Sequence, residues 1–195
     1  MTIRLATAHD AAQIPITMAR AFIDYGWNRW TVDPDDHYSR LVDLYTIFVA
    51  EFGRSLDAVW VSDDVASVAA WLPPGIAGPD DQFIQKHGDR LALLHGCRFE
   101  AALAANDAVG EYRPQERHWY LASMATHPDF QGRGLGAQVL RPVLELCDRD
   151  GLPAYTDTVS EDNLRFYAKQ GFEVHAEAEL PDAGPHIWFL HRQPQ

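Results

Sequence analysis

Three glycines alternate with other residues in the stretch Gln131-Gly132-Arg133-Gly134-Leu135-Gly136. The apolar and aromatic run 119–126 before it predicts a strand, and the helical spacing of apolar residues over 137–149 predicts a helix after it. Glycines let the backbone turn sharply and approach a ligand closely. The first amides of the following helix have no partner inside the helix, and the helix dipole is positive at that end. The stretch therefore predicts a site for a phosphate or pyrophosphate, with Arg133 adding charge at its mouth.

Two other interpretations of this loop remain open. Gly132, Gly134 and Ala137 also satisfy the dinucleotide-binding pattern G-x-G-x-x-G/A, and Asp157 follows at roughly the distance where such proteins bind a ribose. Against a nucleotide-dependent oxidoreductase, the loop lies late in the chain and too little sequence follows for the rest of a dinucleotide-binding sheet. The remaining alternative is a turn that only caps the helix, although three glycines are costly without a ligand.

Hydrophobic periodicity divides the rest of the chain into strands and helices. Strands are predicted at 3–6, 58–61, 65–72, 154–159, 172–180 and 187–191. Helices are predicted at 8–24, from Asp33-Pro34 to about Gly53, at 163–170, and within 80–108 as two or three short helices; Thr7 and Asp10 cap the first, and 25–30 reads as a loop. This order predicts a single domain of mixed α/β class.

Composition narrows the classes of function. The 195 residues are 47% hydrophobic and 23% charged, which is a globular composition, and the net charge is −12. An acidic surface repels nucleic-acid phosphates and anionic lipids and attracts a cationic amine, so we expect no nucleic-acid or membrane partner. The two cysteines form neither a disulfide framework nor a metal-binding spacing, so we expect no metal and a reducing, cytoplasmic setting. The N-terminal residues lack the pattern of a signal peptide.

A second motif lies downstream of the glycine loop, in the run Asn163-Leu164-Arg165-Phe166-Tyr167-Ala168-Lys169-Gln170-Gly171-Phe172. The two motifs, in this order, resemble those of the GCN5-related N-acetyltransferases, the GNAT family. The resemblance implies a mostly antiparallel sheet that is split between two parallel strands, with helices on both faces. It also divides the single domain into an N-terminal part, 1–117, that carries acceptor-site helices and a part, 118–195, that binds acetyl-CoA.

The same resemblance assigns the donor site. Acetyl-CoA would lie in the split between the strands 119–126 and 154–159, with no metal. The pantetheine arm would pair with the backbone amides of Met124, Ala125 and Thr126. The remaining implied cofactor contacts are Gln131, Gly132, Arg133, Gly134, Leu135, Gly136, Ala137, Asn163 and Tyr167.

The implied chemistry is direct attack of a neutral amine on the thioester. Tyr167 would protonate the leaving thiolate, and Asp157, where a relative has a glutamate, would accept the proton of the amine. A backbone amide near Ser123 or Met124 would stabilise the oxyanion. Purely structural roles also fit these residues: Tyr167 as a core tyrosine, Asp157 as a structural hydrogen-bond acceptor and Asn163 as a helix cap.

The acceptor is the least defined part of the prediction. Over nearly the whole chain the sequence resembles the branch that acetylates the aminonucleoside antibiotic puromycin, which implies a primary amine of a small molecule as acceptor. Tyr25, Trp27, Trp30 and Asp157 are the expected acceptor-binding residues, with the tryptophans forming an aromatic wall for a cation. The tryptophans also suit a role in filling the gap between the first two helices. A non-catalytic CoA-binding module is the alternative function, and a monomer or homodimer is expected.

Overall fold

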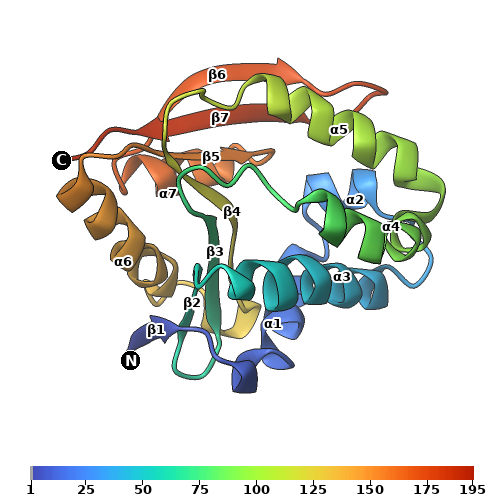
Figure 1. The fold of residues 1–195 in the computed structure, drawn as a ribbon, viewed down its shortest axis with the longest axis horizontal. Helices are drawn as coiled ribbons and strands as arrows, with labels where there is room; N and C mark the ends of the chain where they lie inside the picture. The colour runs from blue at the N-terminus through green and yellow to red at the C-terminus, as the bar shows by residue number, and fades with distance from the viewer. Residues whose placement is uncertain (1) are drawn as a thin grey trace.

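The computed structural model describes residues 2–195, in which a single sheet of seven strands runs through the chain (Figure 1). The strands lie in the order β1-β2-β3-β4-β5-β7-β6. Their bounds are β1 Ile3–Leu5, β2 Val59–Ser62, β3 Ser67–Leu72, β4 Trp119–Thr126, β5 Ala154–Thr158, β6 Glu173–Glu179 and β7 His186–Arg192. Neighbouring strands pair antiparallel except β4 and β5, which are parallel.

The parallel pair separates soon after it starts. Trp119–Leu121 of β4 pairs with Ala154–Thr156 of β5, and no further residue pairs join the two strands although β4 continues to Thr126. Figure 1 shows β4 turning away from β5 beyond this point. The mixed α/β class and the predicted split sheet are therefore confirmed.

Within residues 2–195, seven α-helices cover the two faces of the sheet. They are α1 Gln13–Phe22, α2 Gly26–Thr31, α3 His37–Tyr45, α4 Asp81–His95, α5 Phe99–Glu111, α6 Leu135–Asp150 and α7 Asp162–Ala168. Alternation along β3 separates two cores: Ala69 and Trp71 pack with α6, whereas Val68 and Ala70 pack with α1. Of the helices in the described part of the chain, none combines the length and apolar character needed to cross a membrane.

The N-terminal half departs from the prediction in three places. The helix expected at 8–24 is a 3₁₀ turn, Ala8–Asp10, followed by α1. The segment expected as a loop at 25–30 forms most of α2, because buried Trp30 packs it against α5 and β7. The helix expected to open at Asp33-Pro34 begins at His37 instead. The Asp33 carboxylate accepts the amides of Asp35 and Cys97, at 3.0 and 3.2 Å, and so ties down a loop rather than capping a helix.

Beyond α3 the chain widens into a π-helix, Thr46–Gly53, and so reaches the predicted end of that helix. The region 80–108 contains α4 and α5 with a 3₁₀ turn, Gly96–Arg98, between them, as the periodicity predicts. These elements, with α2, lie on the side of the molecule away from α6 (Figure 1). Together with α1, they cover the face of the sheet that is opposite α6.

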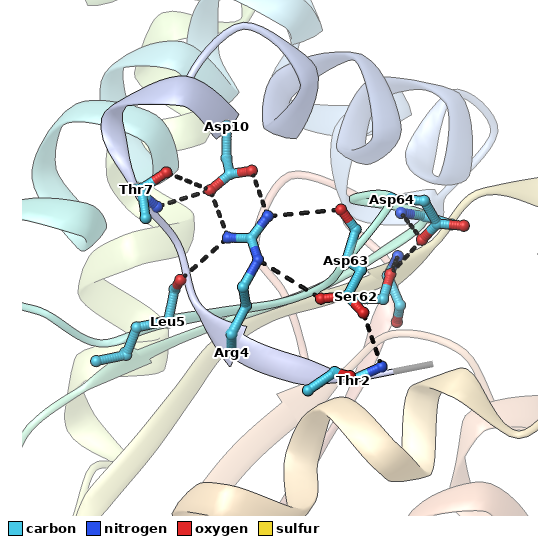
Figure 2. A network of polar contacts seen from close by, with 10 residues as sticks. Thr2, Arg4, Leu5, Thr7, Asp10, Ser62, Asp63 and Asp64 are labelled. Atoms are coloured by element: carbon cyan, nitrogen blue, oxygen red, sulfur yellow. Dashed lines mark hydrogen bonds and ion pairs between the residues drawn. The ribbon is translucent and has the colours of Figure 1, made fainter.

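A polar network fixes the first strand to the first turn (Figure 2). The Asp10 carboxylate is buried and accepts Arg4 Nη1 and Nη2 at 2.7 and 2.8 Å. It also accepts the backbone amide and the hydroxyl of Thr7, at 2.7 and 2.9 Å. The predicted pairing of Thr7 with Asp10 is therefore present, and Arg4 adds a contact that the sequence does not indicate.

Candidate active site

A cleft of about 1100 Å³ opens where β4 and β5 separate. One end is lined by β4, the glycine loop, the start of α6, and α7. The other end is lined by aromatic and apolar side chains from α2, α5 and the π-helix, among them Trp27, Phe48, Phe52, Phe99 and Leu103. The cleft therefore joins the two faces of the sheet through the gap between its parallel strands.

The glycine loop forms an open cradle at the first end. Gly132 and Gly134 have φ of +74° and +75°, a backbone conformation that side chains disfavour, and a Cβ on Gly132 would meet nothing within 4 Å. Gly134 is the N-cap of the 16-residue helix α6, whose first amides therefore face the cleft mouth. A Cβ on Gly136 would lie 3.4 Å from the Phe166 ring, so this glycine allows α6 to pack closely on α7. An open backbone cradle at a helix N-terminus fits a pyrophosphate.

The structure brings most of the predicted donor residues to this cleft. Those that line it are Met124, Ala125, Thr126, Gln131, Gly132, Gly134, Leu135, Gly136, Ala137, Asn163 and Tyr167. The β4 backbone beyond Leu121 has no β5 partner, which leaves an edge where an extended chain can bind. Arg133 is not among the lining residues: its Nη2 donates to Asp129 O at 3.0 Å, and its guanidinium lies over the Phe130 ring.

Tyr167 is buried where α7 faces the end of β5, and it lines the cleft. Burial raises the pKa of its phenol well above the ordinary value, so it stays protonated at neutral pH. Nearby, Thr158 Oγ1 accepts Asn163 Nδ2 at 3.0 Å and lies 2.9 Å from the Tyr25 hydroxyl. The Asn163 side chain therefore links α7 to β5.

Asp157 reaches the cleft from β5 on the other face of the sheet and is half-buried. Burial raises the pKa of its carboxyl, while a hydrogen bond from the Tyr120 hydroxyl and the charge of Arg113 act in the opposite direction. The Arg113 guanidinium lies 4.5 Å from the centre of the Tyr120 ring. Asp157 and Tyr167 thus approach one cleft from opposite faces of the sheet.

The two predicted tryptophans have different surroundings. Trp27 lines the cleft, as does Tyr25. Trp30 does not: it lies in a core cluster with Leu180, Ile187 and Phe189. A Cβ on Gly184 would lie 2.7 Å from the Trp30 ring, so the chain passes directly over the indole.

Three residues of the site do not emerge from the sequence reasoning. Thr158, which holds Tyr25 and Asn163, lies in a predicted strand, where two threonines at alternate positions of a buried run are a detectable polar signal. Tyr120 sits in an apolar run, and Arg113 sits in what reads as a polar connector. Nothing in the local pattern around Tyr120 and Arg113 indicates that they meet Asp157.

The sequence profile of the Acetyltransferase (GNAT) family matches residues 81–172, from α4 to the end of the α7 motif. A curated protein from Stachybotrys chartarum named "Acetyltransferase" is 28% identical over 209 residues, which cover 98% of this chain and 88% of that protein. An 80-residue match at 31% identity to a probable serine/threonine-protein kinase of Dictyostelium discoideum covers only 11% of that protein.

The fold also has solved relatives. A Corynebacterium glutamicum protein described as "histone acetyltransferase HPA2 and related acetyltransferase" superposes with a TM-score of 0.76 at 21% identity, covering all of this chain and 96% of that one. At this identity the likeness concerns the fold alone. Together with the family match over residues 81–172 and the fungal relative, this likeness supports an acetyltransferase that is similar to the GNAT family.

Proposed function

We propose that this acetyltransferase moves the acetyl group of acetyl-CoA to the primary amine of a small molecule. The observation that carries the proposal is the joint lining of one cleft by Tyr167, Asp157 and the glycine cradle. The aromatic end of the cleft suits an acceptor with an apolar or aromatic body, and the −12 net charge attracts a cationic amine. An aminonucleoside such as puromycin combines these features.

The residues at the first end bind and orient the donor, which supplies an acetyl thioester open to attack by an amine. The amides of the glycine loop and of the start of α6 hold the pyrophosphate, and the free edge of β4 holds the pantetheine arm. A backbone amide near Ser123 or Met124 donates to the developing oxyanion. Asn163 fixes the α7 end of this arrangement through Thr158.

Two side chains move protons in the proposed reaction. Tyr167 Oη carries a proton at neutral pH, as an ordinary phenol does and as its raised pKa maintains, and it donates this proton to the leaving sulfur. Asp157 accepts the proton that the ammonium group must lose before it attacks. A carboxyl whose pKa burial has raised is a better base than an exposed aspartate, provided that it is still ionised at the working pH.

The test is incubation of the protein with acetyl-CoA and a panel of amines that includes puromycin, with mass spectrometry of the acceptor. We expect one added acetyl group, and we expect Tyr167→Phe to lower kcat by roughly 10²–10⁴-fold while the Kd for acetyl-CoA changes far less. Phe172→Leu in the same core cluster is the control for packing damage. Acetylation of other amines but not of puromycin removes the antibiotic from the proposal. A Tyr167→Phe enzyme with full kcat removes the general acid.

A further inference from the structure

The Tyr120 hydroxyl donates a hydrogen bond to Asp157 Oδ1. The two side chains come from the adjacent strands β4 and β5, and both line the cleft. Tyr120 is itself buried, and its ring packs with Leu72 and Tyr155. The Asp157 carboxylate is therefore held by the Tyr120 hydroxyl, and the Tyr120 ring is itself fixed by its packing in the core.

Arg113 reaches this pair from the segment between α5 and β4. Its guanidinium lies over the Tyr120 ring, 4.5 Å from the centroid, and its Nη1 donates to Ala77 O at 2.6 Å. A cation in this position is attracted by the ring quadrupole, which keeps the arginine on the face of the phenol. Arg113 forms no ion pair with Asp157 within residues 2–195, and its charge lowers the pKa of that carboxyl from its place on the face of the Tyr120 ring.

Other carboxylates in this protein meet arginine directly. Arg4 pairs with Asp10 through two bonds of 2.7 and 2.8 Å, and Arg192 pairs with Asp148 through two bonds of the same lengths. Both arginines lower the pKa of their carboxyl partners, which makes those carboxylates weak bases. An arginine fork on Asp157 would do the same and would also block the oxygens from a substrate.

The remaining groups around Asp157 are neutral at working pH. Tyr25 precedes α2 and Tyr167 lies on α7, and burial raises the pKa of both phenols. Burial and the charge of Asp157 also raise the pKa of Tyr120 well above its ordinary value, so its hydroxyl remains a donor. Among the groups that influence Asp157, Arg113 thus carries the positive charge.

We propose that Tyr120 is a positioning residue that orients Asp157 and keeps it ionised as the base, with Arg113 acting on this pair from the face of the Tyr120 ring. The inference rests on the proposed function for the role of Asp157 as proton acceptor. In that role one proton passes from the substrate ammonium to an Asp157 carboxylate oxygen and then to solvent. Tyr120 keeps its own proton throughout.

The test measures the pKa of Asp157 directly, by ¹³C NMR of the carboxyl carbon in aspartate-labelled protein. An Asp157→Asn sample identifies the signal. We expect Tyr120→Phe to raise this pKa by about one unit, because the half-buried carboxylate loses its donor. Arg113→Gln, which leaves the tyrosine in place, should raise it by less. The control is Tyr155→Phe, since the Tyr155 ring packs in the same cluster but its hydroxyl donates to Glu116.

A kinetic readout separates positioning from packing. In Tyr120→Phe the acid limb of the kcat/KM profile should shift to higher pH by about one unit. At pH values below this limb kcat/KM should be about tenfold lower than in the wild type, and at pH values above it the two should be similar. A tyrosine with only a packing role would lower the rate equally at every pH.

An Asp157 pKa that is unchanged in both Tyr120→Phe and Arg113→Gln overturns the inference. A pKa that rises as stated supports it even if the wild-type protein acetylates no amine in the panel, a result that would instead overturn the proposed function.

Discussion

Asp10 and Asp157 show how the placement of one arginine decides what a carboxylate can do. Arg4 contacts Asp10 through two nitrogens, and this pairing holds the pKa of Asp10 well below its usual range. Arg113 lies over the Tyr120 ring and forms no ion pair with Asp157 among the described residues, and burial leaves the pKa of Asp157 raised. The first arrangement stabilises the fold, whereas the second leaves a carboxylate that can still take up a proton.

Asp10→Asn should lower the free energy of unfolding at pH 7 by about 1–2 kcal/mol, because Arg4 and Thr7 lose a charged acceptor and solvent screens the partly exposed arginine. The folded-state pKa of Asp10 lies below its unfolded value. Its contribution is therefore complete above roughly pH 4–5 and is lost as the pH falls toward the folded pKa. Urea unfolding between pH 7 and pH 3 should show the wild-type advantage shrinking in this window.

Asp63→Asn provides the matched control. Asp63 also faces Arg4, at 3.7 Å, but about half of its side chain is exposed. A pair of this kind contributes little, so the change should stay within about 0.5 kcal/mol at any pH. Equal losses of unfolding free energy in the two variants would mean that the buried Arg4–Asp10 pair stabilises the protein no more than the exposed Arg4–Asp63 pair does.

At the scale of the element, α6 ends on a glycine with positive φ at both termini. Gly134 stands before its first turn with φ +75°, and Gly151 follows its last turn with φ +65°. Neither position has a close neighbour that a Cβ would strike. The two ends thus carry a similar backbone constraint, but Gly134 lines the cleft and Gly151 does not.

Gly134→Glu should abolish measurable acetyl-CoA binding, because the side chain places bulk and negative charge in the proposed phosphate cradle. Gly151→Glu should leave the Kd unchanged. Each variant should lose about 1–2 kcal/mol of stability from the left-handed conformation. Isothermal titration calorimetry measures the Kd, and unchanged affinity in Gly134→Glu would show that the donor lies elsewhere.

At the scale of the whole molecule, the split sheet connects two environments. The α6 face supplies the glycine cradle and Tyr167, while the opposite face supplies aromatic side chains and Asp157. In the proposed reaction, donor and acceptor would therefore enter from different sides and meet where β4 and β5 part. Binding of acetyl-CoA at the donor end of the cleft should therefore stabilise the elements on both faces of the sheet together.

Acetyl-CoA at 100 times its Kd should stabilise the protein by about 2.7 kcal/mol, which corresponds to a rise in Tm of about 5–10 °C for a chain of this size. NADH at the same concentration should leave Tm unchanged, because a dinucleotide site is not expected here. Differential scanning fluorimetry makes the comparison. A shift with NADH alone would revive the interpretation as a nucleotide-dependent oxidoreductase.

Local signals in the sequence are sufficient to predict the main elements in the second half of the chain. The glycines at 132, 134 and 136 need particular backbone conformations or close packing, and these needs are visible in the residue types. The apolar stripe of α6 and the motif on α7 likewise depend on near neighbours in the chain. For that reason α6 follows from the residue pattern alone, and the split sheet and the grouping of the donor residues follow from the family resemblance that the two motifs carry.

Only the tertiary structure determines where Trp30 lies and which residues contact Asp157. Trp30 completes a cluster with β7 and α5, and this burial turns an apparent loop into α2. Asp157 meets Tyr120 across the sheet, and Arg113 comes from a connector without regular structure. Contacts between residues distant in sequence leave no periodic pattern in the sequence, so the surroundings of the proposed base are visible only in the folded chain.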